Sequence, residues 1–144
     1  MLFRSQLKEL VHTKDLFQRI TISDYVFSKC LLFAKVNLPD EEFHLYQKLF
    51  DIIYQQLIQP DLLIYLQASV PTLVGQIQKR GREYEENIRL DYLKRLNELY
   101  NKWIDGYKEG SLLVVDVDKN KFPENEEHLG EIITRIDAQL YGLF

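Results

Sequence analysis

Two short apolar runs dominate the pattern of hydrophobic and polar positions along this chain. Residues 62–66 read LLIYL and residues 112–117 read LLVVDV, so they are apolar at successive positions rather than at alternate ones. Runs of this length and character are typical of parallel strands that are covered on both faces. A third segment, residues 18–22 (QRITI), alternates and carries β-branched residues. The pattern therefore predicts about three strands.

Around these strands, apolar residues recur every three or four positions, which is the spacing of amphipathic helices. The helical segments are residues 2–12, 24–35, 40–58, 70–80, 91–107 and 124–141. Ser23 or Asp24, then Asp40 and Ser69, stand where three helices begin and are residue types that cap helix N-termini. Strands that alternate with helices indicate βαβ units and a parallel sheet. We therefore expect one α/β domain over residues 1–144, with five to six helices.

Composition narrows the class of protein. A chain of 144 residues with 46% apolar and 28% charged residues is ordinary for a soluble globular domain. The net charge of −4 argues against a nucleic-acid partner, and no apolar run approaches the roughly 18 residues of a membrane span. A single cysteine, Cys30, excludes an internal disulfide and fits a reducing cytoplasm. Because Cys30 lies in an apolar helical run, we expect it to be buried.

The three histidines predict no metal site. His12, His44 and His128 are far apart in the sequence and show no spacing typical of metal ligands.

The most polar stretch begins in the last residues of the helix predicted over residues 70–80. Residues 79–86 hold three cations and three carboxylates around one glycine. Arg80 and Arg82 flank that glycine, so they can offer bidentate donors beside a flexible joint. Phosphoryl transfer needs such cations, because charge spreads over the phosphate oxygens in the transition state. The alternative interpretation is a solvated charge cluster, neutralised by the neighbouring glutamates.

Longer stretches carry a resemblance to a family. IYLQAS (64–69), KRGREYEENI (79–88) and LDYLKRLNELYNKW (90–103) resemble, in this order and spacing, the second half of the deoxynucleoside kinases. These are P-loop phosphotransferases that move a phosphate from ATP to the 5′-hydroxyl of a deoxynucleoside. Upstream, SDYVFSKCLLFAKVNLPDEEFHLYQKLF (23–50) is similar to a bacterial deoxyadenosine and deoxyguanosine kinase branch. The resemblance covers nearly the whole chain and implies a three-layer P-loop kinase-like fold.

The resemblance implies roles for several side chains. Arg80 and Arg82 match the lid that closes over the ATP phosphates, and Glu85 matches a glutamate that accepts a hydrogen bond from the 3′-hydroxyl of the deoxyribose. Phe27 matches an aromatic residue that packs on the nucleobase, and Asp24 is a second candidate for contact with the base. The alternatives are an ordinary core position for Phe27 and an ordinary surface carboxylate for Glu85.

A further match lies after the apolar run at 112–117. Asn120, Lys121 and Phe122 match the loop that cradles the adenine of ATP, although a turn between a strand and a helix needs no such purpose. The cofactors that the resemblance implies are ATP and Mg²⁺, with no resident metal held by the chain itself.

The phosphate cradle of the family is absent from this sequence. A P-loop reads G-x-x-x-x-G-K-[ST], and none of the six glycines stands in that frame: Gly75, Gly81, Gly106, Gly110, Gly130 and Gly142. We therefore expect the family's P-loop, its strand and its catalytic-base glutamate to lie upstream of residue 1. On this interpretation the parallel sheet is incomplete and the chain is inactive alone.

Three functional hypotheses follow. The first is a deoxynucleoside kinase of nucleotide salvage that binds ATP and a deoxynucleoside. The second is a non-catalytic interaction or dimerisation module derived from such a kinase, with helices 24–35 and 40–58 as the contact surface of a homodimer. The third is a nucleoside monophosphate kinase, which shares a cationic lid but usually lacks the order IYLQAS…RGREYEEN.

Overall fold

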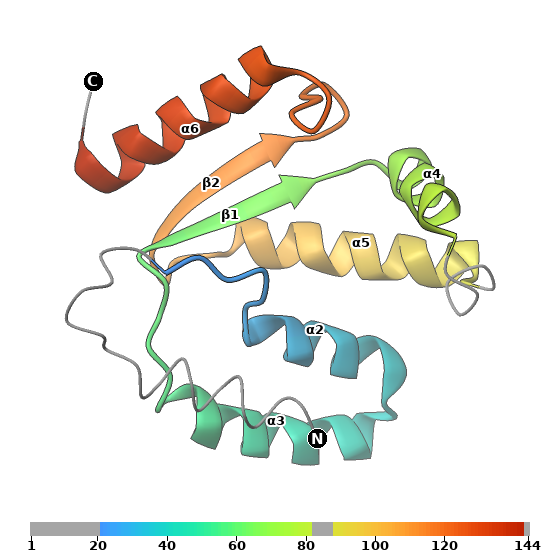
Figure 1. Ribbon diagram of the computed structural model, residues 1–144. Helices are drawn as coiled ribbons and strands as arrows, with labels where there is room; N and C mark the ends of the chain where they lie inside the picture. Colours follow the sequence, from blue (N-terminus) through green and yellow to red (C-terminus); the bar gives the residue numbers. More distant parts are fainter. Residues whose placement is uncertain (1–20, 82–87, 143–144) are drawn as a thin grey trace. The chain divides into compact units, whose positions relative to one another are not determined.

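The computed structural model describes residues 21–81 and 88–142 (Figure 1). The chain divides into two compact units, residues 1–58 (unit 1) and residues 59–144 (unit 2), and each is described by itself. The helix expected over residues 2–12 and most of the strand expected over 18–22 fall outside the described residues, while residues 21 and 22 are not in a strand. One domain over the whole chain stays a prediction.

Unit 1 contains two packed helices, α2 (Ser28–Asn37) and α3 (Asp40–Tyr54). Both were predicted, but with wrong limits. The predicted cap Ser23 instead closes a local turn, because its hydroxyl donates to the Tyr25 carbonyl (3.0 Å) and accepts from the Tyr25 N–H (3.2 Å). The helix therefore starts at Ser28 rather than at residue 24.

The second helix of unit 1 differs from expectation at both ends. Asp40 is the first helical residue rather than the cap, and with Glu41 and Glu42 it places negative charge in the first turn, where the helix dipole favours it. The C-terminal end is at Tyr54, four residues before the predicted limit of 58.

Aromatic rings hold these two helices together. Phe27 stacks on Phe50 with ring centroids 4.9 Å apart, and Phe50 stacks on Tyr54 at 5.1 Å. Ser28 is buried and its hydroxyl donates to the Tyr54 hydroxyl (3.3 Å). Cys30 hydrogen-bonds the Tyr25 hydroxyl and is half-buried, so the expectation of a buried thiol was wrong.

Unit 2 is built on a parallel sheet of two strands within the described residues, β1 (Leu62–Gln67) and β2 (Ser111–Asp116). Leu62 pairs with Ser111, and the register runs to Gln67 opposite Asp116. These are the two apolar runs, so both strand predictions are confirmed.

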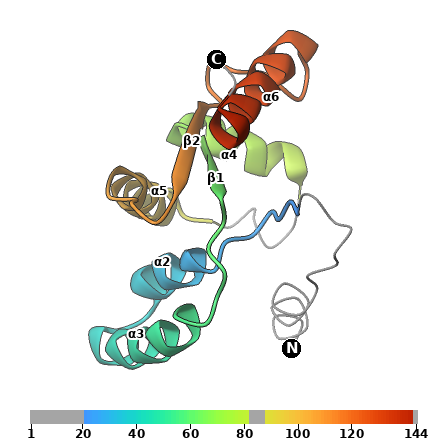
Figure 2. The same cartoon turned by 90° about the vertical axis from the view of Figure 1, so that its left-hand side faces the viewer.

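A helix packs on each face of this sheet, but the expected cover on both faces is incomplete for β1, because Ile64 (40%) and Leu66 (50%) are exposed. The helices are α4 (Val70–Arg80), α5 (Leu90–Asp105) and α6 (Glu126–Tyr141). The sheet lies between α6 on one side and α5 on the other (Figures 1 and 2). Leu113, Val115 and Ile132 form the core beneath α6, and Val115 is fully buried. On the opposite face Tyr65 stacks on Tyr100 of α5 at 6.3 Å. The α/β class is therefore confirmed, in three layers.

The helix ends of unit 2 follow recognisable chemistry. Gly81 ends α4 with φ of 61°, a left-handed conformation that glycine adopts without steric cost. Asn125 caps α6 by accepting from the N–H groups of Glu127 and His128, so α6 begins at Glu126 rather than at 124. No helix in the described part of the chain is long and apolar enough to cross a membrane.

Candidate functional site

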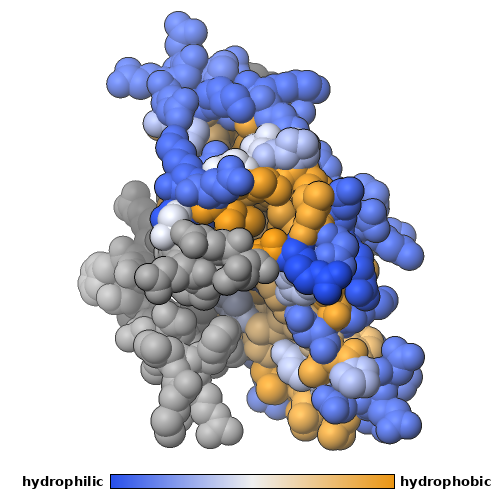
Figure 3. Space-filling view, turned by 90° about the vertical axis from the view of Figure 1, so that its right-hand side faces the viewer, coloured by the Kyte–Doolittle hydropathy of each residue, from blue (hydrophilic) through white to orange (hydrophobic). Residues whose placement is uncertain are grey.

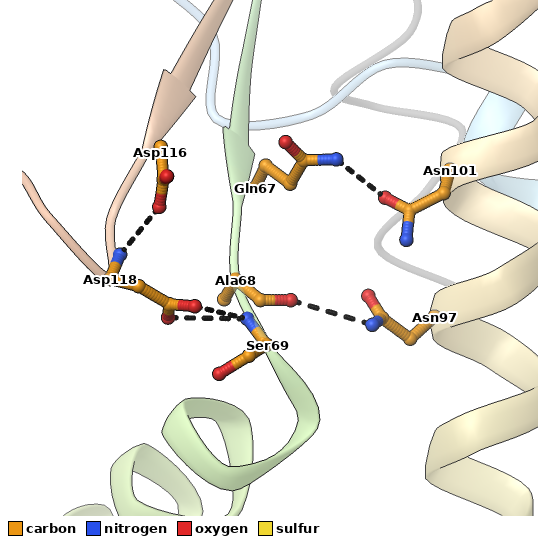
Figure 4. Close-up of a pocket in the computed structure, with 7 residues that line it drawn as sticks. All are labelled: Gln67, Ala68, Ser69, Asn97, Asn101, Asp116 and Asp118. Atoms are coloured by element: carbon orange, nitrogen blue, oxygen red, sulfur yellow. Dashed lines mark hydrogen bonds between the residues drawn. The ribbon is translucent and has the colours of Figure 1, made fainter.

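A polar pocket of about 250 Å³ lies where the two parallel strands end (Figure 4). Its lining comes from the ends of β1 and β2, the start of α4 and one face of α5: Gln67, Ala68, Ser69, Asn97, Asn101, Asp116 and Asp118. In open α/β sheets, ligands bind outside the carboxyl ends of the strands. This edge of the sheet is therefore the candidate site of unit 2.

One wall of the pocket is a contact between the segment after β2 and the start of α4. Both carboxylate oxygens of Asp118 lie 3.2 Å from the Ser69 N–H group, at the N-cap of α4 (Figure 4). A hydrogen bond from the Thr72 hydroxyl and a second from the Ser69 N–H hold the pKa of Asp118 below its ordinary value. The predicted cap Ser69 occupies the right position, but its hydroxyl bonds Thr72 rather than the backbone.

This contact decides what the start of α4 can bind. A helix N-terminus attracts anions, including phosphate. Here a carboxylate of the chain itself takes that place, and Asp116 holds the carboxylate-bearing segment by accepting from the Asp118 N–H (3.0 Å). We conclude that the N-terminus of α4 serves as an internal contact and is not a phosphate cradle.

The opposite wall joins β1 to α5. The Asn101 side-chain oxygen accepts from the Tyr65 hydroxyl (3.2 Å) and from the Gln67 amide (3.1 Å), and the Asn97 amide donates to the Ala68 carbonyl (3.4 Å). Burial, and then the charge of Asp105, raise the pKa of Tyr65, which keeps its hydroxyl protonated as a donor. The pocket is therefore walled by side chains that also fix its shape.

The segment Asn120–Phe122 follows β2 and is internally bonded. The Asn120 side chain accepts from the Phe122 N–H (3.0 Å) and donates to the His128 carbonyl (3.4 Å). His128 Nδ1 accepts from the Lys121 N–H (2.9 Å), and Lys121 Nζ donates to the Val117 carbonyl (3.2 Å). The Phe122 ring packs against the core beneath α6. These three side chains therefore shape the loop themselves.

The structure brings this loop close to the end of α4. Lys79 Nζ and Glu124 Oε1 form an ion pair at 3.3 Å, and both side chains are largely exposed. An exposed pair contributes about 0–1 kcal/mol, so the contact reports proximity more than stability. Arg80, the next residue and the last of α4, is exposed at the same helix end. Arg82 and Glu85 lie outside the described residues.

The remaining predicted site residues belong to unit 1. Asp24 is exposed in the bend before α2, and the ring of Phe27 is committed to a stack with Phe50. The stack explains the aromatic residue at this position without a ligand. Contact of Phe27 or Asp24 with a base stays a prediction.

None of the seven residues that line the pocket was predicted from the sequence as a site residue. Asn97 and Asn101 are spaced i, i+4 and so share one face of a helix, and Asp118 lies two positions after the last residue of β2. Polar residues just beyond a predicted parallel strand were the available signal. Their partners, 29 to 49 residues away, were not readable from local pattern.

The described residues do not form a metal site. They contain no group of three or more His, Cys, Asp or Glu side chains that could hold a metal ion. Mg²⁺ is commonly bound through one or two carboxylates together with substrate phosphates, but Asp118 is already engaged by α4. We therefore assign no step to Mg²⁺ in this part of the chain.

Comparisons of the sequence and of the structure with known proteins both find deoxynucleoside kinases. The sequence model of the family described as deoxynucleoside kinase matches residues 2–141. The deoxyguanosine kinase of Bacillus subtilis (strain 168) is 32% identical over 136 residues, covering 90% of this chain and 66% of the relative. A deoxyguanosine kinase of Lactobacillus johnsonii is 30% identical, covering 96% of this chain and 65% of the relative. The chain thus spans about two thirds of the length of these relatives.

Solved structures agree on the fold. A deoxyadenosine kinase from M. mycoides, solved with dCMP and a flexible dCDP, superposes with a TM-score of 0.72 at 23% identity, covering 94% of this chain and 70% of that one. The same kinase with bound dATP gives a TM-score of 0.68 at 22% identity. The predicted P-loop kinase-like fold is therefore confirmed, and the chain belongs to the deoxynucleoside kinase family.

Proposed function

We propose that this chain forms part of a cytoplasmic deoxynucleoside kinase of nucleotide salvage, which transfers the γ-phosphate of ATP to the 5′-hydroxyl of a deoxynucleoside. The observation that carries the proposal is the contact of Lys79 with Glu124. It places the helix end that bears Arg80 beside the loop after β2, at the carboxyl edge of a parallel sheet. Family membership supports the same assignment.

In this proposal the end of α4 and the loop after β2 bind different parts of ATP. Arg80, with Arg82, faces the phosphates, because guanidinium groups match phosphate oxygens with paired donors. The loop Asn120–Phe122 faces the adenine, and its internal hydrogen bonds hold it ready for binding. Catalysis of phosphoryl transfer depends mostly on this kind of positioning and charge stabilisation.

The deoxynucleoside is assigned to three other residues. Glu85 would accept from the 3′-hydroxyl, and Phe27 and Asp24 would contact the base. The relatives include kinases of deoxyguanosine, deoxyadenosine and deoxycytidine. Binding of all four deoxynucleosides to the chain should therefore be measured.

Turnover by the isolated 144-residue chain is not expected. Its sequence holds no G-x-x-x-x-G-K-[ST] segment to surround the phosphates. The proposal for the chain itself is therefore binding of ATP without phosphate transfer. ATP-dependent phosphorylation of any deoxynucleoside by the pure chain would contradict this.

The deciding experiment is equilibrium binding of ATP to the chain by calorimetry, with Arg80→Ala as the test variant. Arg95→Ala is the matched control, because Arg95 is an exposed arginine of α5 without an assigned role. We expect R80A to weaken ATP binding about tenfold or more, as for a lost charged hydrogen bond of about 1.5–3 kcal/mol. Equal affinities of the wild type, R80A and R95A would contradict the assignment of Arg80.

A second candidate function is that of a homodimerisation module. It is favoured by the apolar side chains that α3 leaves exposed: Leu45 (64%), Leu49 (55%) and Ile52 (60%). Figure 3 shows hydrophobic surface of unit 1 at the lower end of the view. We propose that this stripe on α3, with α2 beside it, is the contact between two copies of the chain. The mass of the chain in solution tests it.

A further inference from the structure

The segment between β2 and α6 contacts both the N-terminal and the C-terminal end of α4. Asp118 meets the N-terminal end, where its carboxylate accepts from the Ser69 N–H at 3.2 Å. Glu124 meets the C-terminal end through Lys79 at 3.3 Å. The two contacts lie six positions apart on one segment, and the loop Asn120–Phe122 lies between them.

These two contacts differ in kind. The Lys79–Glu124 pair joins two long, largely exposed side chains, and such pairs hold geometry weakly. Asp118 instead engages a backbone group and the Thr72 hydroxyl with a short side chain. Its negative charge also lies at the end of the helix where the dipole is positive. Of the two contacts, Asp118 is therefore the one that holds the start of α4 to the segment after β2.

The position of the helix start determines the position of its end. The 11 residues of α4 form a continuous helix, which is about 16 Å long at 1.5 Å per residue. A helix of this length moves as a body, so a shift at Ser69 changes where Arg80 lies. The segment that carries Asp118 is itself held to the sheet, because the Val117 N–H donates to the Gln67 carbonyl (2.9 Å) and the Asp118 N–H to Asp116.

We propose that Asp118 is a positioning residue, which holds α4 so that Arg80 reaches the phosphates of a nucleotide whose adenine lies on the loop Asn120–Phe122. This inference rests on the proposed function, and it adds a link between the two parts of the site. Asp118 does not itself contact the nucleotide in this arrangement.

The test compares two ligands, ATP and adenosine, that differ in the phosphates. Asp118→Ala should weaken ATP binding roughly fivefold or more, in the range typical of coupling between sites, and leave adenosine binding unchanged. Asp118→Asn keeps an acceptor for the Ser69 N–H and should restore most of the ATP affinity. Glu131→Gln removes an exposed carboxylate of α6 and is the matched control. Equal losses for ATP and adenosine in D118A would show a general structural role and overturn the proposal.

A double-mutant cycle tests whether Asp118 acts on ATP binding through Arg80. If Asp118 acts by positioning Arg80, D118A should have no further effect on ATP affinity in an R80A background. Additive losses would overturn the proposal.

Hydrogen exchange separates this proposal from the proposed function. In the chain without ligand, D118A should speed exchange of the amides at the start of α4, and exchange in β2 should stay as in the wild type. Unchanged exchange at α4 would overturn the positioning role. Absence of ATP binding by the wild type would overturn the proposed function and the link to Arg80, whereas the exchange result would still report what holds α4.

Discussion

At the scale of single residues, His128 connects the loop after β2 to α6. Its Nδ1 accepts from the Lys121 N–H at 2.9 Å, and the backbone N–H of His128 donates to the side-chain oxygen of the helix cap Asn125 (3.4 Å). A neutral imidazole that accepts at Nδ1 carries its proton at Nε2. The loop shape thus depends on a ring supplied by the first turn of the following helix.

Replacing this ring tests its role. We expect His128→Ala to lower the free energy of unfolding by about 1 kcal/mol, as for one lost hydrogen bond, and to speed exchange of the Lys121 amide. His128→Asn places an oxygen the same number of bonds from the backbone as Nδ1 and should restore most of the protection. Thermal melting and hydrogen exchange measure both effects. Identical exchange at Lys121 in H128A and the wild type would contradict this role.

Asp118 gives the chain a dependence on pH with a definite sign. Its pKa is held below the ordinary value by the Thr72 hydroxyl and the Ser69 N–H. Folding therefore favours the charged carboxylate, so this stabilisation is complete above the pKa of the unfolded chain. It is lost as the pH falls through the lower pKa of the folded chain. The other charged groups nearby are Asp116, Lys119 and Lys121.

The comparison that isolates this effect is the melting temperature of the wild type and Asp118→Asn. We expect the wild type to be more stable near neutral pH, and the difference to shrink between about pH 5 and about pH 2, around the ordinary pKa of aspartate. A difference that stays constant over this range would show that the charge of Asp118 contributes nothing at the start of α4.

At the scale of elements, α5 is joined to β1 by a polar contact rather than by apolar packing alone. One oxygen of Asn101 serves two donors, the Tyr65 hydroxyl and the Gln67 amide. Asn101→Ala leaves both donors without this acceptor, and we expect it to cost about 1–3 kcal/mol of unfolding free energy. Asn97→Ala removes a single bond of 3.4 Å and should cost less. Urea denaturation ranks the two variants, and a larger loss for N97A would contradict this account.

The elements themselves were largely predictable, because periodicity depends only on which face of an element is buried. The apolar runs that became β1 and β2 and the stripes of α3 to α6 were readable in this way. The limits of the helices were not predictable, because a short polar side chain can either cap a helix or close a local turn. Ser23 closes a turn, and Asn125 caps α6, which begins at Glu126 rather than at residue 124. The pocket was not predicted as a site, since contacts such as that of Asp118 with Ser69 join positions 49 apart.

At the scale of the whole molecule, the order of IYLQAS, KRGREYEENI and LDYLKRLNELYNKW indicated the family, and the family match over residues 2–141 confirms it. The order was informative because it combines an apolar strand, a cationic helix end and a following helix in one spacing. The net charge and the length of the apolar runs argued only against a nucleic-acid partner and a membrane span. The sequence proposed helices 24–35 and 40–58 as a dimer contact, and the structure adds which apolar side chains of α3 are exposed.

The exposed stripe of α3 leads to the prediction at this scale. Leu45, Leu49 and Ile52 lie at i, i+4 and i+7, so they form one face, and each is more than half exposed. In a two-fold dimer this face would meet its own copy, so one substitution acts twice. Leu49→Glu then sets two carboxylates against an apolar surface and against each other. We expect the wild type to have the mass of a dimer by light scattering, and L49E that of a monomer.

Two controls make this outcome specific. Asp51→Lys changes an exposed charge on another face of α3 and should leave the dimer intact. The circular dichroism of L49E should match that of the wild type, because Leu49 is not part of the core of unit 1. A monomeric wild type would contradict the dimer outright. A dimer that survives L49E would move the contact away from α3, because two buried and unpaired carboxylates cost far more than the exposed apolar side chains return on burial.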